Sequence, residues 1–360
     1  MLLRRYDVST ALPGRAQIIS LFLSTGPFGA ESVTRAMSEV EAYKLFQGHP
    51  NIISMVDFVV STDSSRSAVS GFSTDSDTQK TVYILLPYFR RGNLQDAINA
   101  NLVNHTVFPE KQLLRLFLGV CRGLQALHEH RLKSPGSVRR GPGAGQAGDD
   151  TEDHPLMNNS TIATSTEGVS EGDLRPYAHR DIKPGNVIIA DDGTTPILMD
   201  FGSLTPAPTS ITSRQQAIAV QDHAAETSTM PYRAPELFDV KTGSVIDTKV
   251  DIWAMGATLF CALYGHSPFE LATEESGGSL ALAVCSGTYT FPAPGRLGGR
   301  KPGQEDASED VKNIVRMCLK VEPSERPDIQ GLIKEVERVL GMLGGEAPNE
   351  EFAIDDEGDD

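Results

Sequence analysis

The 360-residue sequence has little cysteine and no long apolar run. Its four cysteines stand far apart with no CxxC pair, which excludes a zinc-ribbon or disulfide-framework protein and favours a reducing compartment. The apolar stretch AQIISLFLSTG near the N-terminus falls short of the roughly eighteen residues that a membrane-spanning helix needs. Basic residues are also scarce, 32 against 48 acidic ones, and a net charge of -16 argues against a nucleic-acid-binding protein.

The chain is long enough for one large two-lobed domain or two ordinary ones. Its hydrophobic content of 39% is sufficient to form a core. Residues 134–176 are rich in Gly, Ser, Thr and Asp without periodicity, so we expect a disordered insertion. Its Ser and Thr residues could be phosphorylation sites, but such a composition is more often that of a solvated spacer. Residues 346–360 form an acidic tail that we expect to remain in solvent.

Hydrophobic periodicity divides the remainder into a part containing strands and a mostly helical part. Residues 32–46 repeat apolar side chains at three- and four-residue steps, which predicts an amphipathic helix. Residues 51–60 and 81–89 predict strands on either side of a polar surface loop. Residues 111–130 are apolar at nearly every helical phase and predict a largely buried helix.

Beyond the insertion, the segments NVIIA and PILMD flank the turn DDGTT and predict a hairpin. Three later segments have the apolar spacing of helices: DIWAMGATLFCALYG, VKNIVRMCLK and IQGLIKEVERVLGML. No internal repeat is visible, so the sequence predicts a short β-containing part followed by helices.

The stretch YAHRDIKPGNVII carries residues suited to phosphoryl transfer. Asp181 can accept the proton of an attacking hydroxyl, and Lys183 can offset charge on the transferred phosphate. The amide oxygen of Asn186 and the carboxylate of Asp200, in MDFGS, are the hard ligands that Mg²⁺ prefers. Each signature alone is more simply a surface ion pair or a hairpin turn, but their order, with one hairpin between them, favours catalysis.

These motifs, HRDIKPGN, DFG, YRAPELF and VDIWAMG, resemble the catalytic lobe of a eukaryotic serine/threonine protein kinase. The resemblance implies an α+β bilobal fold with a small, incomplete β-rich N-terminal lobe and a mostly helical C-terminal lobe. It places an atypical segment at 1–26 and a kinase domain at 27–345, divided into lobes 27–89 and 90–345. It also implies ATP and Mg²⁺ as cofactors and proteins bearing Ser or Thr as partners.

The same resemblance assigns roles to residues outside the catalytic loop. Thr229 would steady the catalytic aspartate and lysine and help seat a substrate Ser or Thr. Glu236 would form a structural ion pair with Arg326, and Asp251 would be a buried carboxylate that holds the catalytic-loop backbone.

The segment LLPYFRRGNL resembles the hinge between the two lobes of a kinase. The backbone groups of Pro87 and Phe89 would then contact adenine, with Leu86 at the back of the pocket and Ile188 as its floor. Taken alone, the segment is equally a strand that ends in an ordinary turn.

A finer resemblance lies between DFG and APE, where Ala217, Val220 and Ala224 keep helical spacing in a segment that most kinases leave extended. This feature, with LMDFGS and GHPNI, is similar to the myristoylated and palmitoylated kinase of the Numb-associated group. Such relatives are anchored on Golgi or vacuolar membranes. This chain begins Met-Leu-Leu with no cysteine before Cys121, so we expect a cytoplasmic protein whose membrane association would need another acylation motif.

The sequence departs from the kinase pattern near its start. The helix glutamate is expected at Glu39, with Glu41 as a nearby alternative, but no lysine occurs between Met1 and Tyr43 and no GxGxxG is present. The place of the ATP-binding lysine falls near Phe22, which cannot bind phosphate.

Three explanations of this departure stay open. The first residues could come from a wrong gene start, which the intact catalytic set favours. The chain could instead be a pseudokinase that acts as a scaffold or regulator. A displaced cation, Arg15, Arg35 or Lys44, could also take the place of the lysine, although guanidinium geometry differs from that of ammonium.

Overall fold

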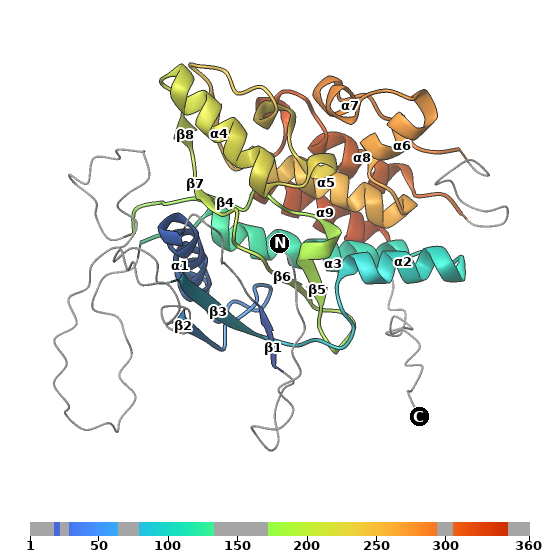
Figure 1. Ribbon diagram of the computed structural model, residues 1–360. Helices are drawn as coiled ribbons and strands as arrows, with labels where there is room; N and C mark the ends of the chain where they lie inside the picture. The colour runs from blue at the N-terminus through green and yellow to red at the C-terminus, as the bar shows by residue number, and fades with distance from the viewer. Residues whose placement is uncertain (1–17, 22–28, 64–78, 133–171, 294–304, 345–360) are drawn as a thin grey trace.

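The computed structural model describes residues 18–21, 29–63, 79–132, 172–293 and 305–344, which form two lobes (Figure 1). The smaller lobe holds a sheet and one helix, and the larger lobe is mostly helical. This confirms the predicted α+β bilobal arrangement. The expected tail, most of the expected insertion and nearly all of the N-terminal segment lie outside the described residues.

The small lobe is built on an antiparallel sheet with the strand order β1-β3-β2. Its strands are β1 (Ile18–Leu21), β2 (Asp57–Asp63) and β3 (Gln79–Pro87). Helix α1 (Gly29–Leu45) packs on β3, close to the predicted span. Strand β3 alternates between buried Val82, Ile84 and Leu86 and more exposed neighbours, because successive side chains of a strand point to opposite faces.

The predicted strand at 51–60 is only partly correct. Strand β2 begins at Asp57, and the buried residues before it form a connection that crosses to the large lobe. There the backbone N–H of Ile53 donates to the carbonyl of Leu198 at 2.9 Å, and that of Leu198 donates to Asn51 at 2.9 Å. An apolar run bounded by turns does not distinguish a strand from a buried loop.

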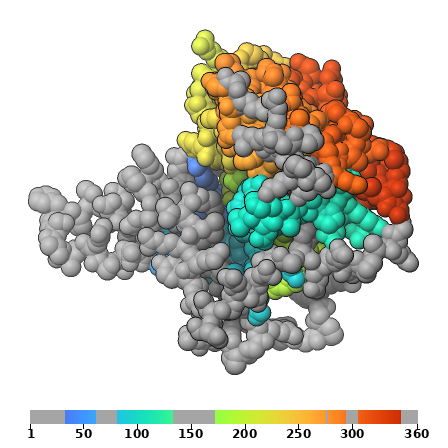
Figure 2. All heavy atoms as spheres, turned by 90° about the vertical axis from the view of Figure 1, so that its right-hand side faces the viewer, coloured from blue at the N-terminus to red at the C-terminus, as the bar shows by residue number. Residues whose placement is uncertain are grey.

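The large lobe is assembled around α5, which is buried along nearly its whole length. In Figure 2 the orange and red atoms of this lobe form one body above the cyan region. The helices are α2 (Leu94–Asn104), α3 (Glu110–His128), α4 (Arg214–Thr227), α5 (Lys249–Tyr264), α6 (Pro268–Ser276), α7 (Leu280–Ser286), α8 (Glu309–Cys318) and α9 (Ile329–Met342). None of the helices in the described ranges is long and apolar enough to cross a membrane.

Short strands and 3₁₀ turns complete the large lobe. The paired strands are β4 (Tyr177–Ala178) with β7 (Thr205–Pro206), β5 (Val187–Ile189) with β6 (Pro196–Leu198), and β8 (Thr209–Ser210) with β9 (Val245–Ile246). The 3₁₀ turns are η1 (Pro184–Asn186), η2 (Met230–Tyr232), η3 (Pro235–Leu237) and η4 (Pro323–Glu325). The β5–β6 pair confirms the predicted hairpin.

Two local features differ from the prediction. Helix α2 was not predicted, although a capping box marks its start: the side chain of Asn93 accepts from the N–H of Asp96, and Asp96 accepts from that of Asn93. Residues 172–176, which we expected within the insertion, pair with the segment that follows α3, since Arg175 N–H donates to the carbonyl of His130 at 2.7 Å.

Helix α4 confirms the helix predicted between the DFG and APE motifs. It begins after Ser213, whose hydroxyl accepts from the N–H of Gln216. Ala217 and Ala224 are buried on its inner side, and Val220 packs beside them. Small side chains let this helix lie close to the lobe beneath it.

Candidate active site

Asp181 is the centre of a compact hydrogen-bond network. Its Oδ1 accepts from the backbone N–H of Thr229 at 2.8 Å and from the Thr229 hydroxyl at 2.7 Å. Its Oδ2 accepts from Lys183 Nζ at 2.7 Å and from Asn186 Nδ2 at 3.0 Å. The structure therefore brings together the predicted residues Asp181, Lys183, Thr229 and Asn186, and Lys183 also donates to the Thr229 hydroxyl.

A second carboxylate, that of Asp251, holds the backbone beneath this network. It accepts from the N–H groups of His179 and Arg180, both at 2.7 Å, as predicted. His128 Nε2 lies 2.9 Å from the same carboxylate, and no motif marked this histidine. Burial alone would raise the pKa of Asp251, but the hydrogen bond and charge of His128 hold it below its ordinary value.

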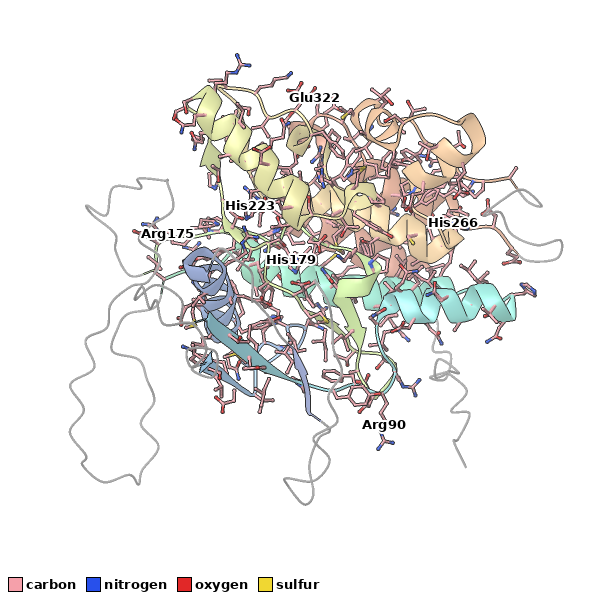
Figure 3. The ribbon with its side chains drawn as sticks, viewed as in Figure 1. Arg90, Arg175, His179, His223, His266 and Glu322 are labelled. Atoms are coloured by element: carbon pink, nitrogen blue, oxygen red, sulfur yellow. The ribbon has the colours of Figure 1, made fainter. Side chains whose placement is uncertain are left out.

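Arg180 adopts a left-handed backbone conformation, with φ of 66°, and its side chain is buried. Burial lowers the pKa of Arg180 to about 10. Its charge reaches His223 of α4, and Figure 3 shows His223 between α1 and α4, beside the region of His179. Among the described residues, Nε and Nη2 of Arg180 have no hydrogen-bond partner.

Asn186 ends η1 directly before β5, and Asp200 follows β6 by two residues, so the two residues lie at the same end of the β5–β6 hairpin. The N–H of Met199 donates to the carbonyl of Asn186 at 3.0 Å, which brings the next residue, Asp200, beside it. Asp200 has a φ of 68°, a strained conformation that is common at functional sites. Because the amide nitrogen of Asn186 donates to Asp181, its amide oxygen is the atom that can face a cation.

This donor pair fits Mg²⁺. Within the described ranges no three His, Cys, Asp or Glu side chains gather as a metal site. An amide oxygen and one carboxylate suit an ion that takes its other ligands from phosphate and water, which is how Mg²⁺ is bound in phosphoryl-transfer sites.

Glu39 lies beside Asp200, and Glu41 does not. A β-carbon added at Gly202 would lie 3.6 Å from Glu39 Oε2 and 3.3 Å from Asp200 Oδ1, so both carboxylates flank one point. Burial and the charge of Asp200 raise the pKa of Glu39 to about 7, against a hydrogen bond from Tyr43. Glu41 instead pairs with Lys44 on the surface at 2.9 Å.

No described cation pairs with Glu39. Arg35 pairs with Glu226 of α4 at 3.3 Å, and Lys44 pairs with Glu41, so neither of these two predicted substitutes reaches it. In the register of β1 and β3, Leu21 pairs with Ile84. Phe22, where the lysine was expected, and Arg15 lie outside the described residues. The site therefore fits magnesium but lacks, in its described part, the cation that anchors ATP phosphates.

The raised pKa of Glu39 predicts a pH-dependent stability. Between about pH 4.5 and pH 7 the unfolded chain loses a proton that folded Glu39 retains, so stability falls as pH rises through this window. We expect Glu39→Gln to remove this cost, with an advantage over the parent that grows by about 2 kcal/mol between roughly pH 5.5 and pH 8 in denaturant unfolding. The surface variant Glu41→Gln should show no such growth. A constant difference for Glu39→Gln would contradict the placement of its carboxylate.

The hinge residues occupy the junction between the lobes. Leu86 is buried and Pro87 ends β3, while Phe89 begins the turn that follows. Pro87 has no N–H, so only its carbonyl can bond to adenine. Ile188 of β5 forms a bridge with Asn93, which ties the segment after β3 to the hairpin that Asn186 and Asp200 flank. Leu86 belongs to the hydrophobic core of the described residues, and Ile188 packs against that core.

Comparison with known proteins agrees with this geometry. The model of the protein kinase domain matches residues 174–336. Serine/threonine-protein kinase ENV7 of Saccharomyces cerevisiae is 33% identical, over 84% of this chain and 77% of its own length. Serine/threonine-protein kinase ppk13 of Schizosaccharomyces pombe is 32% identical over 86% and 79%, and serine/threonine-protein kinase 16 of Homo sapiens is 28% identical over 86% and 78%.

This chain belongs to the serine/threonine protein kinase family. The family's reaction transfers the γ-phosphate of ATP to hydroxyl groups of proteins. The network around Asp181 joins a lysine, an asparagine and a threonine to one carboxylate.

Proposed function

We propose that this chain phosphorylates Ser and Thr residues of proteins with Asp181 as the proton acceptor. The observation that carries the proposal is the convergence of Lys183, Asn186 and Thr229 on the two oxygens of Asp181. These bonds fix the carboxylate in one orientation, and a base must be held within hydrogen-bond reach of the hydroxyl that it deprotonates. Thr229 would contact the incoming Ser or Thr, and Lys183 would offset charge on the phosphate.

Asn186 and Asp200 would hold Mg²⁺, and Leu86, Pro87, Phe89 and Ile188 would hold the adenine of ATP. Mg²⁺ would supply positive charge to the phosphates during transfer. Helix α1 would set Glu39 beside this site. The observation that supports the hinge assignment is the hydrogen-bonded and bridged connection between residues 89–93 and the β5–β6 hairpin.

The metal assignment is tested by ligand-induced stabilisation. We expect ATP with Mg²⁺ to raise the melting temperature of the parent, because a ligand that binds only the folded state stabilises it. Asp200→Asn should weaken the Mg²⁺-dependent part of this binding by about 10-fold or more, since a neutral amide cannot replace the charge of the carboxylate. The control is Asp222→Asn on the exposed side of α4. An unchanged Mg²⁺ response in Asp200→Asn would contradict the assignment.

A second function, that of a catalytically impaired scaffold or regulator, is supported by one observation. Glu39 has no described cation partner, so the phosphates of ATP would lack a usual anchor. The two functions differ in a single measurable property, Mg²⁺-dependent transfer of phosphate.

We also propose that the chain belongs to the acylated-kinase branch of the Numb-associated group and acts in the cytoplasm on protein substrates, not on nucleic acid. Helix α4 in the segment between DFG and APE supports the branch. The four cysteines are free, which supports a reducing compartment. Attachment to Golgi or vacuolar membranes would require an acylation motif. Fractionation of cells that express the tagged chain tests this placement.

A further inference from the structure

Arg233 follows Thr229, the threonine that contacts Asp181, by four residues. Its side chain is buried, and its guanidinium carbon lies 4.9 Å from the centre of the Phe238 ring. Among the described residues no carboxylate lies within ion-pair distance of Arg233. A buried cation without a paired carboxylate is costly unless other groups satisfy its donors.

The donors of Arg233 are used at the C-terminal end of α4. Nη2 donates to the carbonyls of Ser228 at 2.8 Å and Ala225 at 3.4 Å, and Nε donates to the Ser228 hydroxyl at 2.7 Å. That hydroxyl donates in turn to the carbonyl of Ala224 at 2.6 Å. The last carbonyls of a helix lack partners within the helix and carry partial negative charge, so a cation is favourable there.

The chain continues from the end of α4 directly to Thr229 in the candidate active site. Helix α4 ends at Thr227, and Thr229, two residues later, contacts Asp181 through both its N–H and its hydroxyl. The chain then turns through η2, where the N–H of Tyr232 donates to the carbonyl of Thr229 at 3.0 Å. Arg233 thus closes a loop that contains Thr229.

Electrostatics connects the same residues. Burial lowers the pKa of Arg233, and the charge of Asp181 acts in the opposite direction, so the guanidinium lies within the field of the proposed base. The planar fork of arginine can reach two carbonyls and a hydroxyl at once, which the single ammonium of lysine cannot do with the same geometry.

We propose that Arg233 is a positioning residue that fixes the end of α4 and thereby holds Thr229 on Asp181. It acts on the seating of the phosphoacceptor and not on ATP. The effect on catalysis rests on the proposed function of Asp181 as the base. The effect on the Thr229 contact does not, because that contact exists whether or not phosphate is transferred.

The test compares Arg233→Met, Arg233→Lys and the matched control Arg214→Met at the exposed start of α4, all in the full 360-residue chain. Amide hydrogen exchange is followed at Thr229, and steady-state transfer is measured with ATP and protein substrate varied in turn. For Arg233→Met we expect exchange at Thr229 to be faster by about 10-fold or more, because the N–H loses its fixed acceptor. We expect kcat/KM for the protein substrate to fall about 10-fold, with KM for ATP within about 2-fold of the parent.

Arg233→Lys should lie between the parent and Arg233→Met, and Arg214→Met should match the parent. Ser228→Ala, which removes one acceptor of Arg233, should change both readouts in the same direction by a smaller factor, and it serves if Arg233→Met does not fold. Parent-like exchange at Thr229 in Arg233→Met, or in both Arg233→Lys and Ser228→Ala, overturns the inference. A rise in KM for ATP as large as the fall in kcat/KM for the protein substrate also overturns it. If the parent itself transfers no phosphate, the proposed function fails, and exchange at Thr229 still decides the role of Arg233.

Discussion

Asp181→Asn is expected to lower kcat for phosphate transfer by about 10³-fold, since a positioned general base contributes roughly 10²- to 10⁴-fold. Asparagine has nearly the same size and keeps one oxygen for the hydrogen bonds from Thr229. It cannot accept the proton of the substrate hydroxyl, so the loss should appear in kcat, measured by transfer of labelled phosphate. Its amide nitrogen would also face the donors of Lys183 and Asn186, so we expect a lower melting temperature in a protein that still folds.

The control for this prediction is Asp222→Asn, which makes the same chemical change on the exposed side of α4. It should transfer phosphate at the rate of the parent. A folded Asp181→Asn protein with parental kcat would contradict the role given to Asp181.

Arg326→Met is expected to lower the free energy of unfolding by about 3–5 kcal/mol, because it leaves the carboxylate of Glu236, which is 15% exposed, without its fully buried partner. Arg326 Nη1 and Nη2 donate to the two carboxylate oxygens of Glu236 at 2.7 and 2.8 Å, which confirms the ion pair inferred from the sequence. The guanidinium also donates to the backbone carbonyls of Lys320, Lys249 and Val321. It lies over the ring of Trp253 at 5.1 Å.

Arg122→Met provides a matched control, because Arg122 pairs with Glu337 on the surface at 3.5 Å. Exposed pairs contribute about 0–1 kcal/mol, so this variant should remain close to the parent in chemical denaturation. Comparable losses in the two variants would show that the buried network around Arg326 is not what stabilises the lobe.

The catalytic residues could be predicted from the sequence because they are close together in the chain. Asp181, Lys183 and Asn186 lie within six positions, and their spacing limits where their side chains can go. Thr229 is 48 positions from Asp181, and only the family resemblance brought the two together. Helix α4 was predictable from Ala217 and Ala224, since their spacing matches one helical face.

Other features depend on contacts that no local pattern shows. Residues 51–56 have the apolar character of a strand, but the backbone groups of Asn51 and Ile53 bond to Leu198 in the other lobe. The sequence assigned no role to Arg233, which directly precedes the APE motif, because its partners, Ser228 and Ala225, are defined only once α4 has formed. The environment of Glu39 likewise depends on the DFG segment packing beside α1.

The most direct measurement of the central claim is Mg²⁺-dependent transfer of labelled phosphate from ATP to a generic protein substrate, followed by identification of the labelled amino acid. Asp181→Asn and Asp200→Asn serve as blanks. We expect label on Ser and Thr from the 360-residue chain, with little or none from either blank. A folded parent that transfers no more phosphate than the two blanks would contradict catalysis by this chain and would favour the scaffold function.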